Sequence, residues 1–137
     1  MMEVQSSPKT QGEVVLVVED DPRVQAIIEL LLVSSGYRVV TANDGIDGLK
    51  VFREHLTTIS VVITDLKMPR LNGVGLVHAI RTEAPNIPIV VASGYLDETS
   101  VAELKGLDVC AFLNKPVAVA QLLKTLTEAA GHGEHTA

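Results

Sequence analysis

The sequence predicts an α/β fold in which helices cover both faces of a five-stranded parallel sheet. Short apolar runs, rich in β-branched residues, recur five times along the chain. Each run is followed by a stretch whose apolar residues are spaced three or four apart, as on one face of a helix. This strict alternation is typical of a doubly wound sheet with right-handed crossovers. A chain of 137 residues can form it around a single core.

The elements follow from local signals. Asp21 is placed to cap the first helix, Pro22 suits its first position, and Gly36 lies just beyond its end. The helix after the fourth strand has a sparse apolar face, which is typical of an element that moves. The predicted strands cover 14–18, 37–42, 59–64, 89–92 and 107–113. The predicted helices cover 22–35, 46–56, 74–83, 97–105 and 117–130.

Composition narrows the class of protein. The net charge of -6, with scattered Lys and Arg, argues against nucleic-acid binding. No apolar run is long enough for a membrane helix, and the start of the chain lacks a signal peptide, so we expect a cytoplasmic protein that binds no membrane. The lone cysteine, Cys110, has apolar neighbours that predict a buried, inert thiol. We expect a folded domain over 13–130 between disordered tails at 1–12 and 131–137.

Polar side chains stand where four of the predicted strands end. Each has a plain explanation by itself, such as a helix cap, a turn or a solvated loop, and Asp65 alone would be weak evidence. The carboxyl ends of parallel strands, however, meet at one edge of the sheet, where ligands bind. We therefore expect these side chains to form one site, in which capping explains Asp21 better than ligation does. They are Glu19, Asp20 and Asp21 after the first strand, Asp65 after the third, Ser93 after the fourth and Lys115 after the fifth.

This set of residues suits phosphoryl chemistry. Converging carboxylates repel one another by about 3 kcal/mol per pair at 5 Å, which a bound cation would relieve. Oxygen ligands without His or Cys favour a hard ion, and Mg²⁺ in particular. A carboxylate such as Asp65 can then carry a phosphoryl group as an acyl phosphate. The ammonium of Lys115 and the hydroxyl of Ser93 would neutralise and hydrogen-bond its oxygens.

These residues resemble the response regulator receiver domain of two-component signalling. The similarity covers residues 13–130 and implies a flavodoxin-like sheet with strand order 2-1-3-4-5. The matching motifs, in chain order, are Glu19-Asp20-Asp21, Asp65-Leu66-Lys67-Met68-Pro69 with Asn72-Gly73, Ser93-Gly94 and Lys115-Pro116.

The resemblance implies a role for each matched residue. Asp65 is the phosphoacceptor, Lys115 pairs with the phosphoryl group, and the bond from Lys115 to Pro116 is often cis. Ser93 is the switch hydroxyl and Phe112 the aromatic switch residue, although the strand pattern suits Phe112 equally well as a core residue. In the family the first acid is often Asp and the aromatic residue is more familiar as Tyr, so Glu19 and Phe112 differ from the commoner pattern.

The resemblance also implies a metal site and two residues that tune hydrolysis. Asp20 and Asp65 would bind Mg²⁺, with Mn²⁺ as a substitute, and Glu19 would reach the ion through water. The backbone carbonyl of Lys67 would complete the protein ligands. Lys67 and Tyr95 stand at positions that tune hydrolysis in the family, and we expect Tyr95 to screen the attacking water.

The predicted function is a phosphorylation-controlled switch rather than an enzyme with an external substrate. A sensor histidine kinase or a histidine phosphotransfer protein would phosphorylate Asp65, and slow autophosphatase chemistry would reset it. Output would pass to a downstream protein through the face at 97–112, with a phosphorylation-dependent homodimer as an alternative. A stand-alone regulator, a phosphorelay intermediate and a receiver cut from a hybrid kinase all fit. The competing functions are an unphosphorylated scaffold and a phosphohydrolase, which would carry an acid where Lys67 stands.

Overall fold

The computed structural model describes the backbone of residues 13–135 and the side chains of residues 13–129. The tail expected at 1–12 lies outside the described residues. The described helices include none that is long and apolar enough to cross a membrane.

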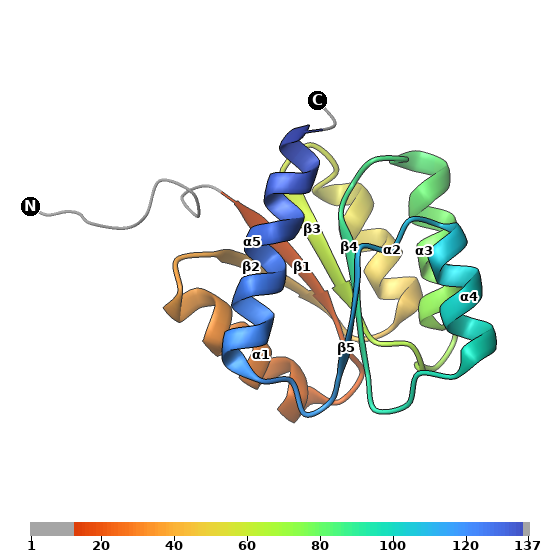
Figure 1. The fold of residues 1–137 in the computed structure, drawn as a ribbon, viewed down its shortest axis with the longest axis horizontal. Helices are drawn as coiled ribbons and strands as arrows, with labels where there is room; N and C mark the ends of the chain where they lie inside the picture. The colour runs from red at the N-terminus through yellow and green to blue at the C-terminus, as the bar shows by residue number, and fades with distance from the viewer. Residues whose placement is uncertain (1–12, 136–137) are drawn as a thin grey trace, which may run out of the picture.

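Five parallel strands form one sheet in the order β2-β1-β3-β4-β5 (Figure 1), which confirms the predicted fold class and strand order. All residues of β1 and β4 are buried, and so are all but Ser60 of β3. A strand covered on both faces needs apolar side chains in both directions, which explains the continuous apolar runs in the sequence. The strands are β1 (Val14–Val18), β2 (Arg38–Ala42), β3 (Ile59–Thr64), β4 (Ile89–Ser93) and β5 (Ala111–Asn114).

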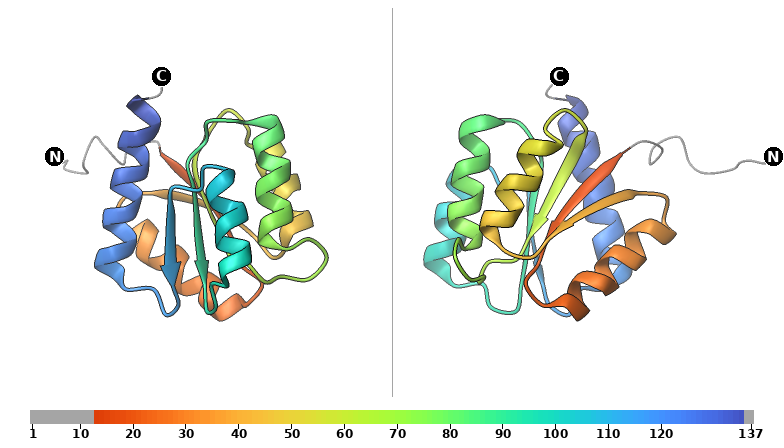
Figure 2. Two further views of the ribbon diagram at one scale, coloured as in Figure 1. Left: turned by 45° about the vertical axis from the view of Figure 1, so that its right-hand side comes forward. Right: turned by 180° about the vertical axis from the view of Figure 1, so that it is seen from behind.

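The five helices lie in two layers, one on each face of the sheet (Figure 2). Helices α1 and α5 pack against Val15, Val17 and other residues of one face. Helices α2, α3 and α4 pack against Leu16, Val18 and other residues of the opposite face. Alternate residues of each strand therefore build two aliphatic cores. The helices are α1 (Pro22–Ser34), α2 (Gly45–Glu54), α3 (Gly73–Glu83), α4 (Glu98–Gly106) and α5 (Val119–His135).

The ends of α1 form as the sequence predicts. Asp21 caps the helix, since its side chain accepts a hydrogen bond from the backbone N–H of Arg23 at 2.9 Å, and Pro22 is the first helical residue. Gly36 has a φ of 100°, a left-handed conformation that glycine adopts without steric cost. These local signals direct α1 along the sheet, with its first turn beside the end of β1.

The predicted fifth strand is wrong in its first half. Residues 107–110 form the turn between α4 and β5 instead, with a φ of 61° at Asp108, and pairing extends to Asn114. The apolar residues Leu107 and Val109 pack against the core without joining the sheet, and that burial explains the misleading pattern. Cys110 is exposed, which contradicts the predicted burial. Its thiol donates a hydrogen bond to the Ile89 carbonyl at 3.3 Å, and desolvation raises its pKa, so the thiol stays protonated at neutral pH.

The last helix also differs from its prediction. It begins at Val119 and runs to His135, so residues 131–135, for which the sequence predicts a disordered tail, are helical. A glycine costs a helix only about 1 kcal/mol relative to alanine, so Gly131 and Gly133 do not end it. Residues 136 and 137 lie outside the described part of the chain.

Candidate functional site

Sheet hydrogen bonds place the polar residues at one edge of the molecule. The backbone N–H of Asp65 donates to the Val18 carbonyl at 3.0 Å, so Asp65 is held beside the end of β1. The N–H of Lys115 donates to the Ser93 carbonyl at 2.9 Å, which holds the end of β5 beside the end of β4. The four strand ends predicted from the sequence thus lie along one edge.

Lys115 joins two carboxylates across that edge. Its Nζ donates to Glu19 Oε1 at 2.5 Å and to Asp65 Oδ2 at 3.0 Å. Glu19 is only 3% exposed and Asp65 only 8%. Burial raises the pKa of the Glu19 carboxyl in spite of the hydrogen bond from Lys115. Desolvation lowers the pKa of the Lys115 ammonium, but hydrogen bonds to Glu19 and Asp65 outweigh it and raise that pKa above its ordinary value, so the cation persists.

Three carboxylates converge beside the lysine. One oxygen each of Glu19, Asp20 and Asp65 lies within 4.8 Å of the others, and Asp20 is the exposed member. Their mutual repulsion is about 3 kcal/mol per pair at an effective dielectric of 20, and Lys115 supplies only one compensating charge. A set of carboxylate oxygens with one member open to solvent fits a hard, partly hydrated cation such as Mg²⁺.

Backbone groups orient the acids. Glu19 Oε2 accepts from the N–H of Asp21 at 3.1 Å, and Asp65 Oδ1 accepts from the N–H of Leu66 at 2.6 Å. Asp21 itself caps α1, as the sequence favours over ligation. Glu19 and Asp65 therefore each keep one oxygen on a backbone N–H and turn the other toward Lys115.

Ser93 and Phe112 lie on neighbouring strands behind the acids. Ser93 is 2% exposed, and its hydroxyl donates to the Tyr95 carbonyl at 3.1 Å and accepts from the Tyr95 N–H at 3.2 Å. Phe112 is paired in register with Val91 and is half-buried against the core. The Ser93 hydroxyl is thus engaged by the loop that leads into α4.

Lys67 and Tyr95 connect two loops at the mouth of the site. Both are exposed, and Lys67 Nζ lies 5.2 Å from the centre of the Tyr95 ring. This cation–π contact joins the loop after β3 to the loop after β4. Tyr95 therefore contacts Lys67 and, through its backbone, Ser93, and the sequence alone did not indicate the contact with Lys67.

Several supporting residues have no role that the sequence predicts. The Thr64 hydroxyl, fully buried, donates to the Asp65 carbonyl at 2.8 Å. Gly73 is required beside the acid, since a Cβ there would lie 2.3 Å from the Asp65 carbonyl oxygen. Gln25 Nε2 donates to the carbonyls of Glu19 and Ala42 and so ties α1 to the edge. The one sequence signal for any of these residues is that Thr64 is a polar residue at the end of an apolar strand.

The peptide bond between Lys115 and Pro116 is cis, as the resemblance implies. A doubly wound domain with three clustered acids and a paired lysine at the strand ends belongs to the class of α/β domains that bind phosphoryl groups and metal at this edge. A family model described as the response regulator receiver domain matches residues 15–127. The chain belongs to that family, whose members are phosphorylated by histidine kinases in two-component systems and bind Mg²⁺ at an acidic pocket.

Similar proteins fall into regulators and kinases. The transcriptional regulatory protein ZraR of Klebsiella oxytoca is 36% identical over 121 residues, 86% of this chain and 26% of that protein. The sensor histidine kinase RcsC of Escherichia coli is 35% identical over 115 residues, 82% of this chain and 12% of that protein. A receiver domain protein of Clostridium thermocellum has a TM-score of 0.87 at 28% identity, covering 91% of this chain and 99% of its own. The chain thus matches a receiver segment within much longer curated relatives.

Proposed function

We propose that this chain is a switch whose state is set by a phosphoryl group on Asp65. The observation that carries the proposal is the buried Asp65 carboxylate, which is hydrogen-bonded to Lys115 and lies within 4.8 Å of two further acids. Asp65 has a nucleophilic oxygen, and Lys115 an ammonium that neutralises charge on the incoming group.

The transfer step balances as a simple displacement. An Asp65 carboxylate oxygen attacks the phosphorus of a phosphohistidine, and the phosphorus–nitrogen bond breaks with its electron pair on the imidazole nitrogen. That nitrogen takes up a proton, and an acyl phosphate remains on Asp65. In the slow reset, water attacks the phosphorus, and phosphate leaves as the Asp65 carboxylate is regenerated. The chain therefore catalyses only reactions on itself.

The proposed metal ligands are Asp20 and Asp65 directly, Glu19 through water, and the backbone carbonyl of Lys67. Mg²⁺, or Mn²⁺ in its place, supplies charge neutralisation of the phosphoryl oxygens when bound. The convergence of Glu19, Asp20 and Asp65 supports this assignment. Lys115 already bridges Glu19 and Asp65, so it would share these oxygens with the ion.

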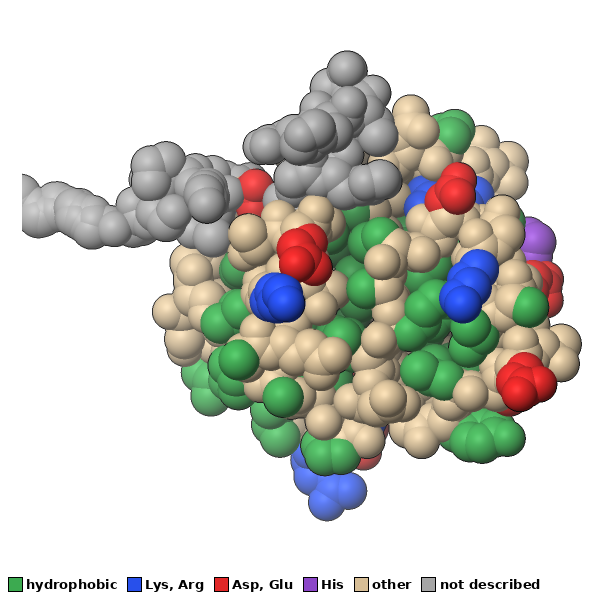
Figure 3. All heavy atoms as spheres, viewed as in Figure 1, with side chains coloured by type: hydrophobic (Ala, Val, Ile, Leu, Met, Phe, Trp, Pro, Cys, Tyr) green, Lys and Arg blue, Asp and Glu red, His purple; other side chains and the backbone are tan. Residues whose placement is uncertain are grey.

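The switch residues we propose are Ser93 and Phe112. To donate to a phosphoryl group on Asp65, the Ser93 hydroxyl must give up its hydrogen bond to the Tyr95 carbonyl. Loss of that hydrogen bond would move the loop that leads into α4. Phe112 lies on the adjoining strand and is partly buried, so it can follow that movement. The affected face, at 97–112, would contact a downstream protein or a second copy of the chain. On the face drawn in Figure 3, hydrophobic side chains are interspersed with charged ones, and several acidic and basic side chains lie next to each other.

An exposed apolar surface on α1, beside the site, is available to a protein that donates the phosphoryl group. Ile27, Leu30 and Val33 of α1 recur at intervals of three and are 58%, 65% and 53% exposed. Their helix begins directly after the acids of the β1 end. A sensor histidine kinase or histidine phosphotransfer protein that binds to α1 would bring its phosphohistidine to Asp65.

We propose 13–130 as the receiver unit, with α5 continuing to His135.

The phosphohydrolase alternative requires an acid two residues beyond Asp65. Lys67 stands there with its ammonium over the Tyr95 ring. Multiple turnover of an added phosphomonoester would favour that alternative over the switch.

The decisive experiment is phosphorylation by acetyl phosphate and Mg²⁺, followed by intact mass spectrometry. We expect the wild-type chain to gain one phosphoryl group and Asp65→Asn to gain none, because the amide is not a nucleophile. Asp108→Asn is the matched control, since that exposed aspartate lies beyond the far end of the sheet, and it should be phosphorylated normally. Phosphorylation of Asp65→Asn would refute the assignment.

A further inference from the structure

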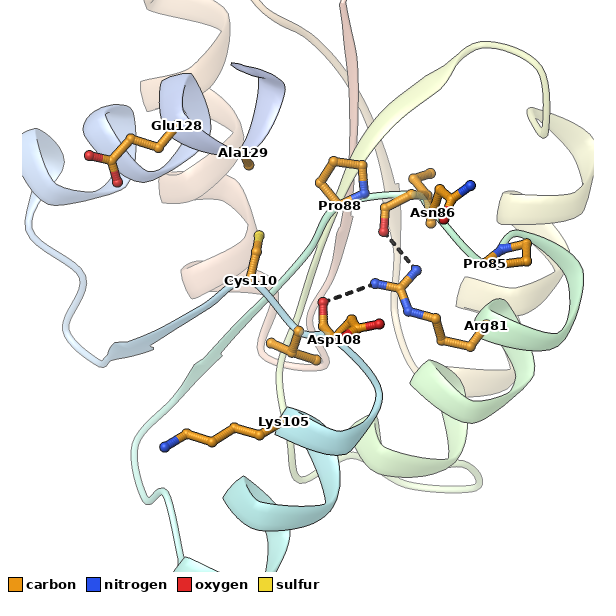
Figure 4. A pocket seen from close by; sticks show the side chains of 11 residues that line it. Arg81, Pro85, Asn86, Pro88, Lys105, Asp108, Cys110, Glu128 and Ala129 are labelled. Carbon is orange, nitrogen blue, oxygen red and sulfur yellow. Dashed lines mark hydrogen bonds between the residues drawn. The ribbon is translucent and has the colours of Figure 1, made fainter. Parts of the chain in front are cut away.

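Arg81 of α3 joins the loop after α3 to the turn after α4, at the edge of the sheet opposite to Asp65. Its Nε donates to the Leu107 carbonyl at 2.7 Å and Nη2 to the Asp108 carbonyl at 3.2 Å, both in the turn after α4. Its Nη1 donates to the carbonyls of Ile87 at 2.7 Å and Ala84 at 3.2 Å, in the loop after α3. Figure 4 shows the guanidinium between these two segments, on the wall of a cavity of about 580 Å³. Arg81 therefore fastens the end of α4 to the end of α3.

Other contacts of α4 with the body of the protein lie in the same half of the helix. Leu104 is fully buried and is the only buried residue of α4. Glu103 Oε2 lies 2.7 Å from His78 Nε2 of α3. The turn continues into Val109, which is also buried, and its N–H donates to the Leu104 carbonyl. Packing, the contact between Glu103 and His78 and the Arg81 hydrogen bonds thus all hold residues 103–109.

The first half of α4 is held mainly by its own cap. Asp97 accepts from the N–H of Ser100 at 2.8 Å, and its carbonyl accepts from the N–H of Val101 at 3.0 Å. Among the described residues, no side chain of 98–102 forms a hydrogen bond or ion pair with another element. Leu96, just before the cap, packs partly buried against the core. This half directly follows the Ser93–Tyr95 turn, where the proposed switch begins.

We propose that phosphorylation turns α4 about its Arg81-fastened end, so that residues 94–102 move while residues 103–109 stay in place. The inference rests on the proposed function, because it assumes that Asp65 receives the phosphoryl group. An element held at one end by directional hydrogen bonds and buried packing rotates there more readily than it slides. The first half of α4, rather than the whole helix, then presents the changed surface to a partner.

Residue-resolved amide NMR tests the pivot in the wild-type chain. The protein is compared with and without beryllofluoride and Mg²⁺, which imitate the phosphoryl group on Asp65. Hydrogen-bonded amides report on both halves, Ser100 and Val101 on the first and Leu107, Asp108 and Val109 on the second. We expect shifts and altered exchange at the first pair and unchanged signals at the other three. Equal changes in both groups would overturn the pivot.

Variants test whether Arg81 is the fastening. In Arg81→Met, we expect amide exchange at Leu107 and Val109 to be about tenfold faster, and beryllofluoride to change these signals as well. Arg53→Met is the matched control, because Arg53 pairs with Glu83 between α2 and α3, away from α4, and it should retain the wild-type pattern. Wild-type exchange in Arg81→Met would overturn the proposal. Should that variant not fold, Arg81→Lys, which keeps the charge but has fewer donors, takes its place with the same criteria.

Failure of the pivot is distinguishable from failure of the switch. If Asp65 is not the phosphoacceptor, beryllofluoride leaves all amides unchanged, including those of Leu66 and Tyr95 beside the site, and the proposed function falls. If only the pivot fails, the amides beside the site respond and the two halves of α4 change together.

Discussion

At the level of single residues, the reactivity proposed for Asp65 depends on the groups that surround it. Lys115 contacts both Asp65 and the more deeply buried Glu19, so two carboxylates share one cation. Without Lys115, the carboxylate of Glu19 would be buried and unpaired, which is costly. The N–H of Leu66 orients the other oxygen of Asp65, while the Ser93 hydroxyl is hydrogen-bonded to the backbone of Tyr95.

Tyr95 belongs to this scale because its effect on hydrolysis would come from one side chain. We predict that Tyr95→Ala shortens the lifetime of the Asp65 phosphoryl group about threefold, because the ring no longer screens the attacking water or holds Lys67. An exposed cation–π contact contributes about 0.5–1 kcal/mol, which corresponds to a change of that size. The decay of the phosphorylated mass measures it. Tyr95→Phe retains the ring and should decay like the wild type, and an unchanged rate in Tyr95→Ala would remove the hypothesis.

At the level of elements, the loop after β3 is packed tightly against the start of α2. Arg70, with a φ of 70°, donates to both carboxylate oxygens of Asp44, the residue that caps α2. A Cβ on Gly45 would lie 1.9 Å from the Leu71 carbonyl oxygen. The loop that begins at Asp65 is thereby supported by a neighbouring helix, which limits its movement.

This close approach gives a stability prediction. Gly45→Ala should destabilise the protein by about 1–3 kcal/mol, because the backbone of the loop must move to admit the methyl group. Gly106→Ala in α4 is the matched control, since its Cβ would meet nothing within 4 Å, and alanine there should be neutral or stabilising by up to about 1 kcal/mol. Urea unfolding measures both variants. Equal stability of the two variants would contradict the packing argument.

At the level of the whole molecule, parallel strand order decides which residues meet. Asp20 follows β1 and Asp65 follows β3, and the two strands are neighbours although more than forty residues separate these acids. At the opposite edge, Arg81 joins α3 to the turn after α4. The chemistry is thus at one edge and the proposed pivot at the other.

Metal binding should appear as stability of the entire domain. Mg²⁺ at about ten times its dissociation constant should add about 1.4 kcal/mol to the free energy of unfolding, since it binds only the assembled acids. In Asp20→Asn this increment should disappear, while the stability without metal should rise, because the neutral amide removes the repulsion between Asp20 and the other two carboxylates. Thermal unfolding with Mg²⁺ and with EDTA measures it. Retention of the increment in Asp20→Asn would exclude Asp20 as a ligand, and Asp108→Asn serves as the unaffected control.

The sequence by itself determined the elements with strong local signals and the set of side chains at their ends. The buried β-branched runs, the Asp21 cap and Gly36 each act within a few residues. The strands and the helix ends that they define can therefore be predicted from the sequence without a structure. The apolar residues Leu107 and Val109 misled because burial alone does not reveal whether a segment joins the sheet.

Only the tertiary structure decided the contacts between distant segments. Lys115 is shared by Glu19 and Asp65, Lys67 lies over Tyr95, and Arg81 donates to the carbonyls of Leu107 and Asp108. The partners in each of these contacts are far apart in the chain. Such contacts depend on strand order, helix placement and loop direction together. The sequence therefore identified the chemical groups of the site, and the fold set their partners and the place where α4 is held.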